Sequence, residues 1–217
     1  MTNKILSLIN EKYPLAEKPL KEFAKFKAKG MKFKCTTYNA EGLGHVCVMR
    51  AKGFMGLMKM DTLIIAPEQK DLPLFSYDRI KAMGNDTLIM ELYDTMGEKK
   101  ANVSSLAGVK SKFAHLPERF AKGEEPEHWY DSIRLPETTS KKSKNASAGF
   151  DSYALTYVLT YLDIEAEACD RGEKLARTDV YANGLVTNGG PATDVFKAQF
   201  GEETTSDIIR GVLFGTK

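Results

Sequence analysis

Apolar and polar residues alternate with a period of two through much of the first half of the chain, which is the pattern of half-buried β-strands. Short stretches rich in Gly, Asn, Asp and Pro separate these segments, as turns do. Because such short connections cannot hold the long crossovers that parallel strands need, the pattern predicts an antiparallel meander. The expected strands are Met31–Asn39, His45–Lys52, Met55–Ala66, Leu72–Met83 and Thr87–Thr95.

The N-terminal segment has helical spacing instead. Ile5, Leu8 and Ile9 recur three to four residues apart, and Leu20, Phe23 and Phe26 do the same among lysines. This spacing predicts two helical pieces within residues 2–29, interrupted by Pro14 and ended by Gly30. We expect them to cap one face of the sheet.

The C-terminal half also predicts helices, from Ser104 to the break at Pro117, over residues 149–171, and as a closing pair at Pro191–Phe200 and Glu203–Phe214. The second of these is expected to be the longest helix, buried from two sides because it carries two apolar stripes. Residues 137–149 have the composition of a loop or mobile segment. Asn183-Gly184 and the turn-forming Asn188-Gly189-Gly190-Pro191 bracket a short segment.

Strands followed by helices favour a single α+β domain over residues 1–217, in which helices cover both faces of an antiparallel sheet. The domain divides into a helical cap at 1–30, the meander at 31–95 and a mainly helical part at 104–217. We expect the N-terminal helices on one face and the C-terminal set on the other. A chain of 217 residues buries roughly 70% of its unfolded surface, which is enough for one substantial core.

The amino-acid composition argues against several classes of function. Lys and Arg total 31 and Asp and Glu 29, so the net charge of +2 gives no reason to expect nucleic acid or membrane as a partner. Cys35, Cys47 and Cys169 have no CxxC spacing, which argues against a disulfide framework or a zinc site and favours the cytoplasm. The sequence shows no signal-peptide pattern and no apolar run of membrane-span length.

Common catalytic motifs do not explain the function of this chain. Its glycines lack the partners of a phosphate-binding loop, and no nucleophile elbow surrounds a serine or cysteine. His45, His115 and His128 lack the spacing of a helical metal site, so we expect no metal, and surface or turn roles for the three histidines.

Asp78 is the candidate that carries chemistry. It alternates with Ser76 and Ile80 on one strand, so these three side chains share a face. In an apolar space a carboxyl resists ionisation and becomes a general acid near neutral pH. The alternative is an ordinary aspartate paired with Arg79, Arg50 or a turn amide, which composition alone favours.

Lysines cluster near the N-terminus and again before the long helix. They are explained either as a solvated surface or as a docking patch for an acidic protein. The cluster comprises Lys18, Lys21, Lys25, Lys27, Lys29, Lys32, Lys34, Lys141, Lys142 and Lys144.

The segment Pro67 to Asp78, with Leu72-Pro73-Leu74-Phe75-Ser76-Tyr77-Asp78, resembles the signature of the ferredoxin-dependent bilin reductases. Its short Pro-to-Asp spacing is also similar to that of the related red chlorophyll catabolite reductases. Three further segments resemble that superfamily in matching order, so that the resemblance covers about residues 31–214. They are Met90–Asp94, Trp129–Pro136 and Asp194–Glu203 with Val212-Leu213-Phe214.

The resemblance implies an α/β/α sandwich that binds a linear tetrapyrrole, such as biliverdin, between the sheet and the C-terminal helices. It also implies an oxidoreductase without a tightly bound cofactor, which receives single electrons from an external, acidic ferredoxin or flavodoxin. Asp78 carries over as the proton donor. We expect a monomer.

Three departures from the family pattern leave the specificity open, and one is that the acid of the family's C-terminal pocket loop falls near Asn188 and Gly189. Arg50 stands where these reductases have a glutamate, and Thr62 or Asp61 where some have a histidine. Arg50 is therefore expected either to weaken Asp78 as an acid or to hold a substrate propionate. A carrier or sensor that binds a tetrapyrrole without reducing it is the alternative, and a purely structural protein without a pocket is a third. The expected substrate contacts are Arg50, Thr62, Ser76, Asn188, Arg134 and Lys141.

Overall fold

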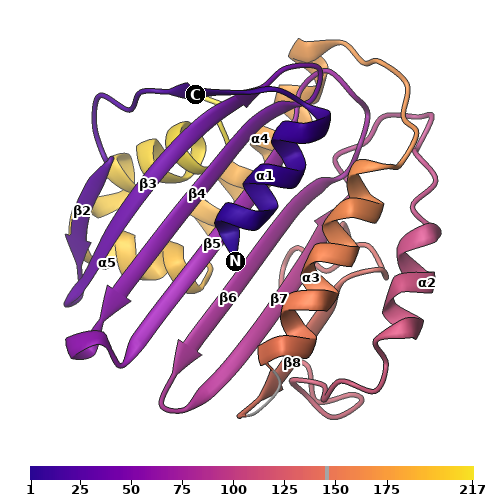
Figure 1. Ribbon diagram of the computed structural model, residues 1–217. Helices are drawn as coiled ribbons and strands as arrows, with labels where there is room; N and C mark the ends of the chain where they lie inside the picture. Colours follow the sequence, from indigo (N-terminus) through magenta and orange to yellow (C-terminus); the bar gives the residue numbers. More distant parts are fainter. Residues whose placement is uncertain (145–146) are drawn as a thin grey trace.

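The computed structural model of the protein describes residues 1–144 and 147–217, and their centre is one antiparallel sheet (Figure 1). The strands follow the order β1-β3-β4-β5-β6-β7-β8, and β2 pairs with β3 beside β1. Consecutive strands from β3 to β7 pair in antiparallel fashion through connections of two to six residues, which confirms the predicted meander. The strands are β1 Leu15–Lys18, β2 Lys25–Ala28, β3 Met31–Ala40, β4 Gly44–Gly53, β5 Met58–Pro67, β6 Leu74–Ala82, β7 Asn85–Tyr93 and β8 Thr139–Ser143.

Helices cover both faces, so the domain is an α/β/α sandwich, as expected (Figure 1). α1 (Thr2–Lys12), α2 (Ser105–Lys112) and α3 (Ser147–Leu162) pack on one face. α4 (Arg171–Asn188), α5 (Pro191–Ser206) and the π-helical η2 (Asp207–Leu213) pack on the other. The expected division between N-terminal and C-terminal helices is therefore wrong for α2 and α3, which pack on the same face as α1. Among the described residues, no helix has the length and apolarity to cross a membrane.

The second helical piece predicted within residues 2–29 is also wrong, because this segment forms β1 and β2. Pro14 and Pro19 leave no room for a helix between them, since proline disrupts a helix interior. The sequence Lys25-Phe26-Lys27-Ala28 alternates with the period of a strand, and Phe26 stacks on Phe33 of β3 with ring centroids 4.9 Å apart. Both short strands pair with β3.

The loop expected at residues 137–149 contains β8, which extends the sheet beyond β7, and then the start of α3. Residues 145 and 146 of that expected loop lie outside the described residues. Thr139 and Lys141 point into one face and Ser140 into the other, so the segment has strand alternation although its residues are polar. Hydropathy therefore gave no signal for this strand.

The helix expected at 149–171 is wrong in its second part, because residues 164–170 are not helical. It is not the longest helix either, since α3 has 16 residues and α4 has 18. α3 ends at Leu162, and α4 begins after Asp170, whose side chain accepts a hydrogen bond of 2.9 Å from the Glu173 amide. α4 then runs through Asn183-Gly184, where the sequence suggested a turn. The closing pair of helices is found as expected, with the break at Gly201, where φ is 80°.

Candidate functional site

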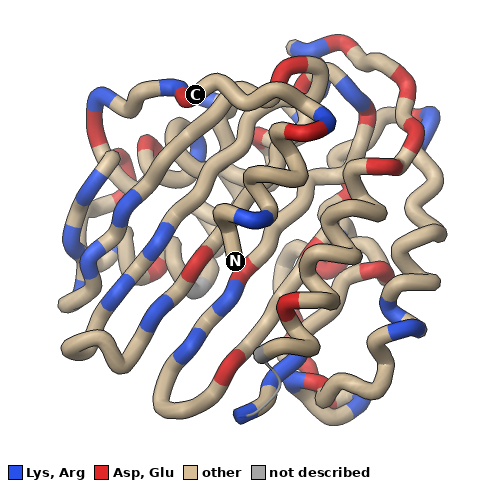
Figure 2. The backbone as a smooth tube through the Cα atoms, viewed as in Figure 1, with Lys and Arg blue, Asp and Glu red and all other residues tan. Residues whose placement is uncertain are grey.

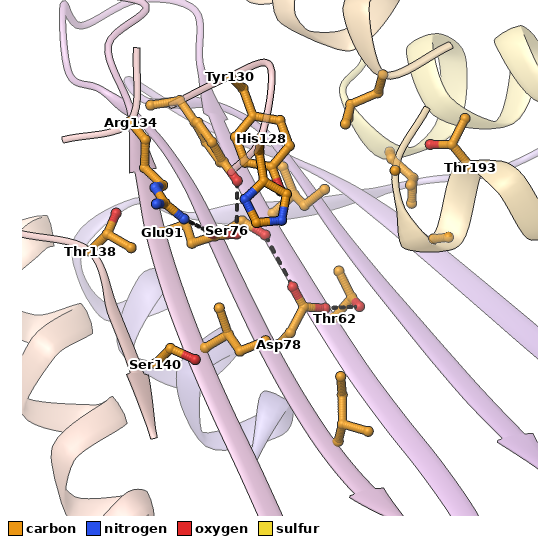
Figure 3. A pocket seen from close by; sticks show the side chains of 18 of the residues that line it. Thr62, Ser76, Asp78, Glu91, His128, Tyr130, Arg134, Thr138, Ser140 and Thr193 are labelled. Atoms are coloured by element: carbon orange, nitrogen blue, oxygen red, sulfur yellow. Dashed lines mark hydrogen bonds and ion pairs between the residues drawn. The ribbon is translucent and has the colours of Figure 1, made fainter. Parts of the chain in front are cut away.

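A cavity of about 680 Å³ lies between the sheet and the C-terminal helices (Figure 3). Its size falls in the range of small-molecule sites, roughly 300–1,000 Å³. Most of its wall is apolar, and the polar side chains gather toward the β6–β8 side of the sheet. The apolar wall includes Phe33, Met49, Met60 and Ile64 from the sheet and Leu185, Val195, Ile209, Leu213 and Phe214 from the helices.

Strand register brings the polar side chains of the sheet together on the cavity face. Asp78 of β6 lies directly opposite Thr62 of β5, and Ser76 lies opposite Glu91 of β7. Residues opposite each other on neighbouring strands share a face. Ser140 of β8 reaches the same face, because Ile89 separates it from Asp78 along one cross-strand row. The sequence-predicted Asp78, Ser76 and Thr62 are thus brought together.

The carboxyl group of Asp78 faces the cavity and accepts two hydrogen bonds (Figure 3). Thr62 donates to Oδ1, and Ser76 donates to Oδ2 at 3.4 Å. The pKa of Asp78 is raised to about 6, chiefly by burial and also by the nearby charge of Glu91, while the two hydroxyl donors and Arg119 act to lower it. Asp78 is half-buried at the wall of a mostly apolar cavity, and this loss of hydration is the largest influence on its pKa.

Neither arginine suggested as a salt-bridge partner faces Asp78. Arg79 lies on the opposite face of the sheet in a buried ion pair with Asp86. Arg50 also faces away from the cavity and donates to Thr2 Oγ1 at 2.9 Å and to Asn3 at the start of α1. The expectation that Arg50 contacts substrate, or weakens Asp78 as an acid, is therefore not supported by its position. Arg50 pairs with Asp61 of β5 and not with the next residue, Thr62, which faces the cavity.

A second polar cluster surrounds Glu91. Tyr93 donates its hydroxyl to Glu91 Oε2 at 2.7 Å, and Arg134 Nη1 lies 3.6 Å from Oε1. Arg134 also forms an ion pair with Asp131 at 3.1 Å. Arg134, one of the expected substrate contacts, therefore lines the cavity, with its guanidinium held by carboxylates.

His128 lines the cavity, although a surface or turn role was expected for it. Its ring stacks on Tyr130 with centroids 4.9 Å apart, and both side chains lie over the Asp78 side of the cavity (Figure 3). A hydrogen bond of Trp129, which lies between these two residues, holds their segment in place: the indole N–H donates to the Gly189 carbonyl at 3.1 Å. The Trp-to-Pro segment that resembles the bilin reductases begins one residue after His128, and this was the available signal.

Two other predicted contacts do not line the cavity. Lys141 is buried on the opposite face, where it donates to the Leu116 carbonyl at 3.2 Å and pairs with Glu118. Asn188 is exposed at the end of α4. Gly190 and Thr193, just beyond it in the chain, line the cavity instead. A residue next to a cavity segment in sequence can still point elsewhere, because the helix end turns the chain.

Fold and cavity together define an α/β/α sandwich that carries a buried carboxyl in an apolar slot between the sheet and the C-terminal helices. Among solved structures, phytochromobilin synthase from tomato, in complex with biliverdin, is similar with a TM-score of 0.75 and 17% sequence identity, over 99% of this chain and 82% of that one. This likeness confirms the bilin-reductase fold that the sequence resemblance implied. A scan against models of protein families finds no match, and neither does a search of curated proteins.

Proposed function

We propose that this protein reduces a linear tetrapyrrole bound in the cavity, with Asp78 as the proton donor. The observation that carries the proposal is a cavity-facing carboxyl with a raised pKa and hydroxyl donors in place of a cationic partner. A slot with long apolar walls and a few polar groups suits an open-chain pigment. The fold it shares with phytochromobilin synthase, which was crystallised with biliverdin, supports the same ligand class.

Reduction of one double bond consumes two electrons and two protons. The electrons come singly from an external ferredoxin or flavodoxin, and no tightly bound cofactor is part of the proposal. Asp78 in its protonated form transfers a proton to the pigment as its electron density rises. The carboxylate that remains is stabilised by the Thr62 and Ser76 hydroxyls, which donate to the charged form. Solvent then returns the proton before the next transfer.

Arg134 is the proposed contact for a propionate of the pigment. A guanidinium binds a carboxylate through two parallel hydrogen bonds. Glu91 and Asp131 hold it at the cavity wall and compensate its charge. A propionate at this position would compete with these carboxylates for the guanidinium.

The test is an anaerobic assay with biliverdin and chemically reduced ferredoxin, comparing the wild type with Asp78→Asn. Loss of a general acid costs on the order of 10²-fold in rate, and we expect a loss of at least this size. An absorbance titration with biliverdin shows in parallel whether both proteins still bind the pigment. Equal turnover by the two proteins would remove Asp78 from the mechanism.

The same experiment separates the proposal from a carrier or sensor. A wild-type protein that binds biliverdin but leaves its spectrum unchanged under reduced ferredoxin would be a binding protein. A protein that leaves the visible spectrum of biliverdin unchanged throughout the titration would not bind this pigment.

A further inference from the structure

Large apolar side chains are exposed at the hairpin turns along one edge of the sheet. The β4–β5 turn exposes Phe54 (63%), Met55 (fully) and Leu57 (69%), and the β6–β7 turn exposes Met83 (90%). Phe54, Met55 and Met83 have φ values of 49°, 53° and 50°, in the left-handed region that favours glycine or asparagine. Bulky apolar residues therefore occupy turn positions where neither folding nor solubility favours them.

Lysines form a straight row across five strands, one residue inward from these turns. Register places them directly opposite one another, in the order Lys27, Lys32, Lys52, Lys59 and Lys81. With strands about 4.8 Å apart, the row spans roughly 19 Å. All five are exposed on the face opposite the cavity, and Figure 2 shows the basic positions side by side across these strands.

The row is poorly neutralised. Lys81 lies 3.6 Å from Asp86, but among the described residues the other four lysines form no ion pair. A second row behind it contains Lys25 and Lys34, followed by Arg50, which lies 4.0 Å from Asp61. Like charges directly opposite each other destabilise a sheet, so this arrangement works against the fold. A straight row of positive charges on one plane is complementary to a planar anionic surface.

We propose that this edge of the sheet binds the surface of an anionic lipid membrane. The apolar turns enter the boundary between headgroups and acyl chains, and the lysine row lies at the level of the anionic headgroups. An acidic protein explains the lysines but gives no role to apolar side chains at the tips of two separate turns. The net charge of +2 does not reveal such a surface, because acidic residues elsewhere in the chain cancel it.

The position of the edge connects it to the cavity, and this step rests on the proposed function. Met31, Met58, Met60 and Ile80 line the cavity on the other face of the same strand ends. Met58 follows directly after the exposed Leu57. A protein bound through the turns would therefore hold the methionine-lined end of its cavity close to the bilayer.

The test is sedimentation with vesicles of phosphatidylcholine alone or of equal parts phosphatidylcholine and phosphatidylserine. We expect the wild type to bind only the anionic vesicles and to dissociate at high salt. The double variant Lys32→Glu/Lys59→Glu should bind at least tenfold more weakly, since each lysine near an anionic surface contributes about fivefold in affinity. Met55→Ser/Met83→Ser should also weaken binding.

The charge reversal is designed to keep the fold. It gives a row of alternating sign, with each glutamate between two lysines, so its urea midpoint should equal or exceed that of the wild type. Lys99→Glu/Lys122→Glu makes the same change in net charge at exposed sites elsewhere and should bind like the wild type.

Equal vesicle binding by all variants, or none by the wild type, would overturn the proposal. Weaker binding of reduced ferredoxin by the row variant, without vesicle binding by the wild type, would assign the surface to an acidic protein instead. Vesicle binding needs no pigment, so its failure is distinguishable from failure of the proposed reductase activity.

Discussion

Thr62 and Asp78 lie directly opposite each other on β5 and β6, and the threonine hydroxyl donates a hydrogen bond to the aspartate carboxylate. The two groups act in opposite directions on one equilibrium. Burial favours the neutral acid, whereas the hydroxyl donor favours the charged form, and the pKa of about 6 is the balance. The sheet register therefore helps to set the pKa of this acid, because it places the Thr62 hydroxyl opposite the carboxyl.

Replacing Thr62 with valine should raise the pKa of Asp78 above its value of about 6, because it removes a donor to the charged form while keeping the side-chain shape. Under the proposed mechanism the reduction rate falls as pH rises through the Asp78 pKa, so this falling limb should move to higher pH in Thr62→Val. Rates measured across a pH series with biliverdin and reduced ferredoxin provide the check. Thr62→Ser retains the hydroxyl and should keep the wild-type midpoint; a midpoint unmoved by valine would contradict the assignment.

The pKa of Asp78 also predicts how stability depends on pH. An aspartate whose pKa rises from 3.8 to about 6 on folding stabilises the native state fully below pH 4, and this contribution is lost as pH rises through 6. At 1.36 kcal/mol for each pKa unit, the loss is about 3 kcal/mol. The asparagine of Asp78→Asn cannot ionise, so this variant does not lose that contribution. The difference in free energy of unfolding, variant minus wild type, should therefore increase by about this amount between pH 4 and neutrality.

Urea unfolding of both proteins over that pH window measures the difference directly. The free energies of unfolding of the two proteins also differ because asparagine alters the hydrogen bonds to Thr62 and Ser76. That part of the difference does not change with pH, so the pH dependence of the difference reports the ionisation of Asp78. Parallel curves would show that the Asp78 carboxyl titrates alike in the folded and unfolded chain.

Local alternation was enough to predict the meander and the shared face of Ser76 and Asp78. A period of two fixes which residues of one strand lie together, and the short turns fix the antiparallel order. Alternation does not fix the register between strands. Arg50 was expected near Asp78, but the observed register pairs it with Asp61, one position away from Thr62, and this single step puts it on the other face.

Contacts distant in sequence explain the remaining errors. β8 is polar, so only its pairing with β7 identifies it as a strand. Gly184 suggested a turn, yet it lies inside α4, where a Cβ atom would come within 2.3 Å of the Trp129 ring. Glycine is required at this position because the indole occupies the space of a side chain, and not because the backbone adopts a special conformation. A single sequence does not show that two residues 55 positions apart are in contact.

Gly184→Ala should therefore displace Trp129. This is the chain's single tryptophan, so its fluorescence reports the change without interference. We expect a shifted emission maximum and weaker biliverdin binding, because Trp129 adjoins the cavity residues His128 and Tyr130.

The matched control for this variant is Gly211→Ala. A Cβ at Gly211 meets nothing within 4 Å, so this second substitution in a helical segment should leave the emission of Trp129 unchanged. Wild-type emission and pigment affinity in Gly184→Ala would contradict the packing role.

Lys174 should be the largest single polar contributor to the attachment of α4 to the sheet. Its side chain is fully buried, and its ammonium donates to the Leu72 carbonyl at 2.6 Å, the Thr95 carbonyl at 2.9 Å and Asp71 Oδ1 at 3.1 Å. Leu72 lies just before β6 and Thr95 just after β7, so one charge joins the helix to two neighbouring strands. Burial lowers the pKa of Lys174, and Asp71 opposes that effect.

Lys174→Met keeps the length of the side chain but leaves three buried acceptors with fewer donors. We expect a loss of about 3 kcal/mol in the free energy of unfolding, since breaking a buried pair costs roughly 3–5 kcal/mol and Arg177 still donates to Asp71 and Thr95. For a domain of this size the melting temperature should fall by roughly 10 °C. Lys99→Met removes an exposed pair with Glu167 and should cost less than about 1 kcal/mol. Thermal and urea unfolding of the two variants side by side decide the point: similar midpoints would mean that α4 is held by its apolar face alone.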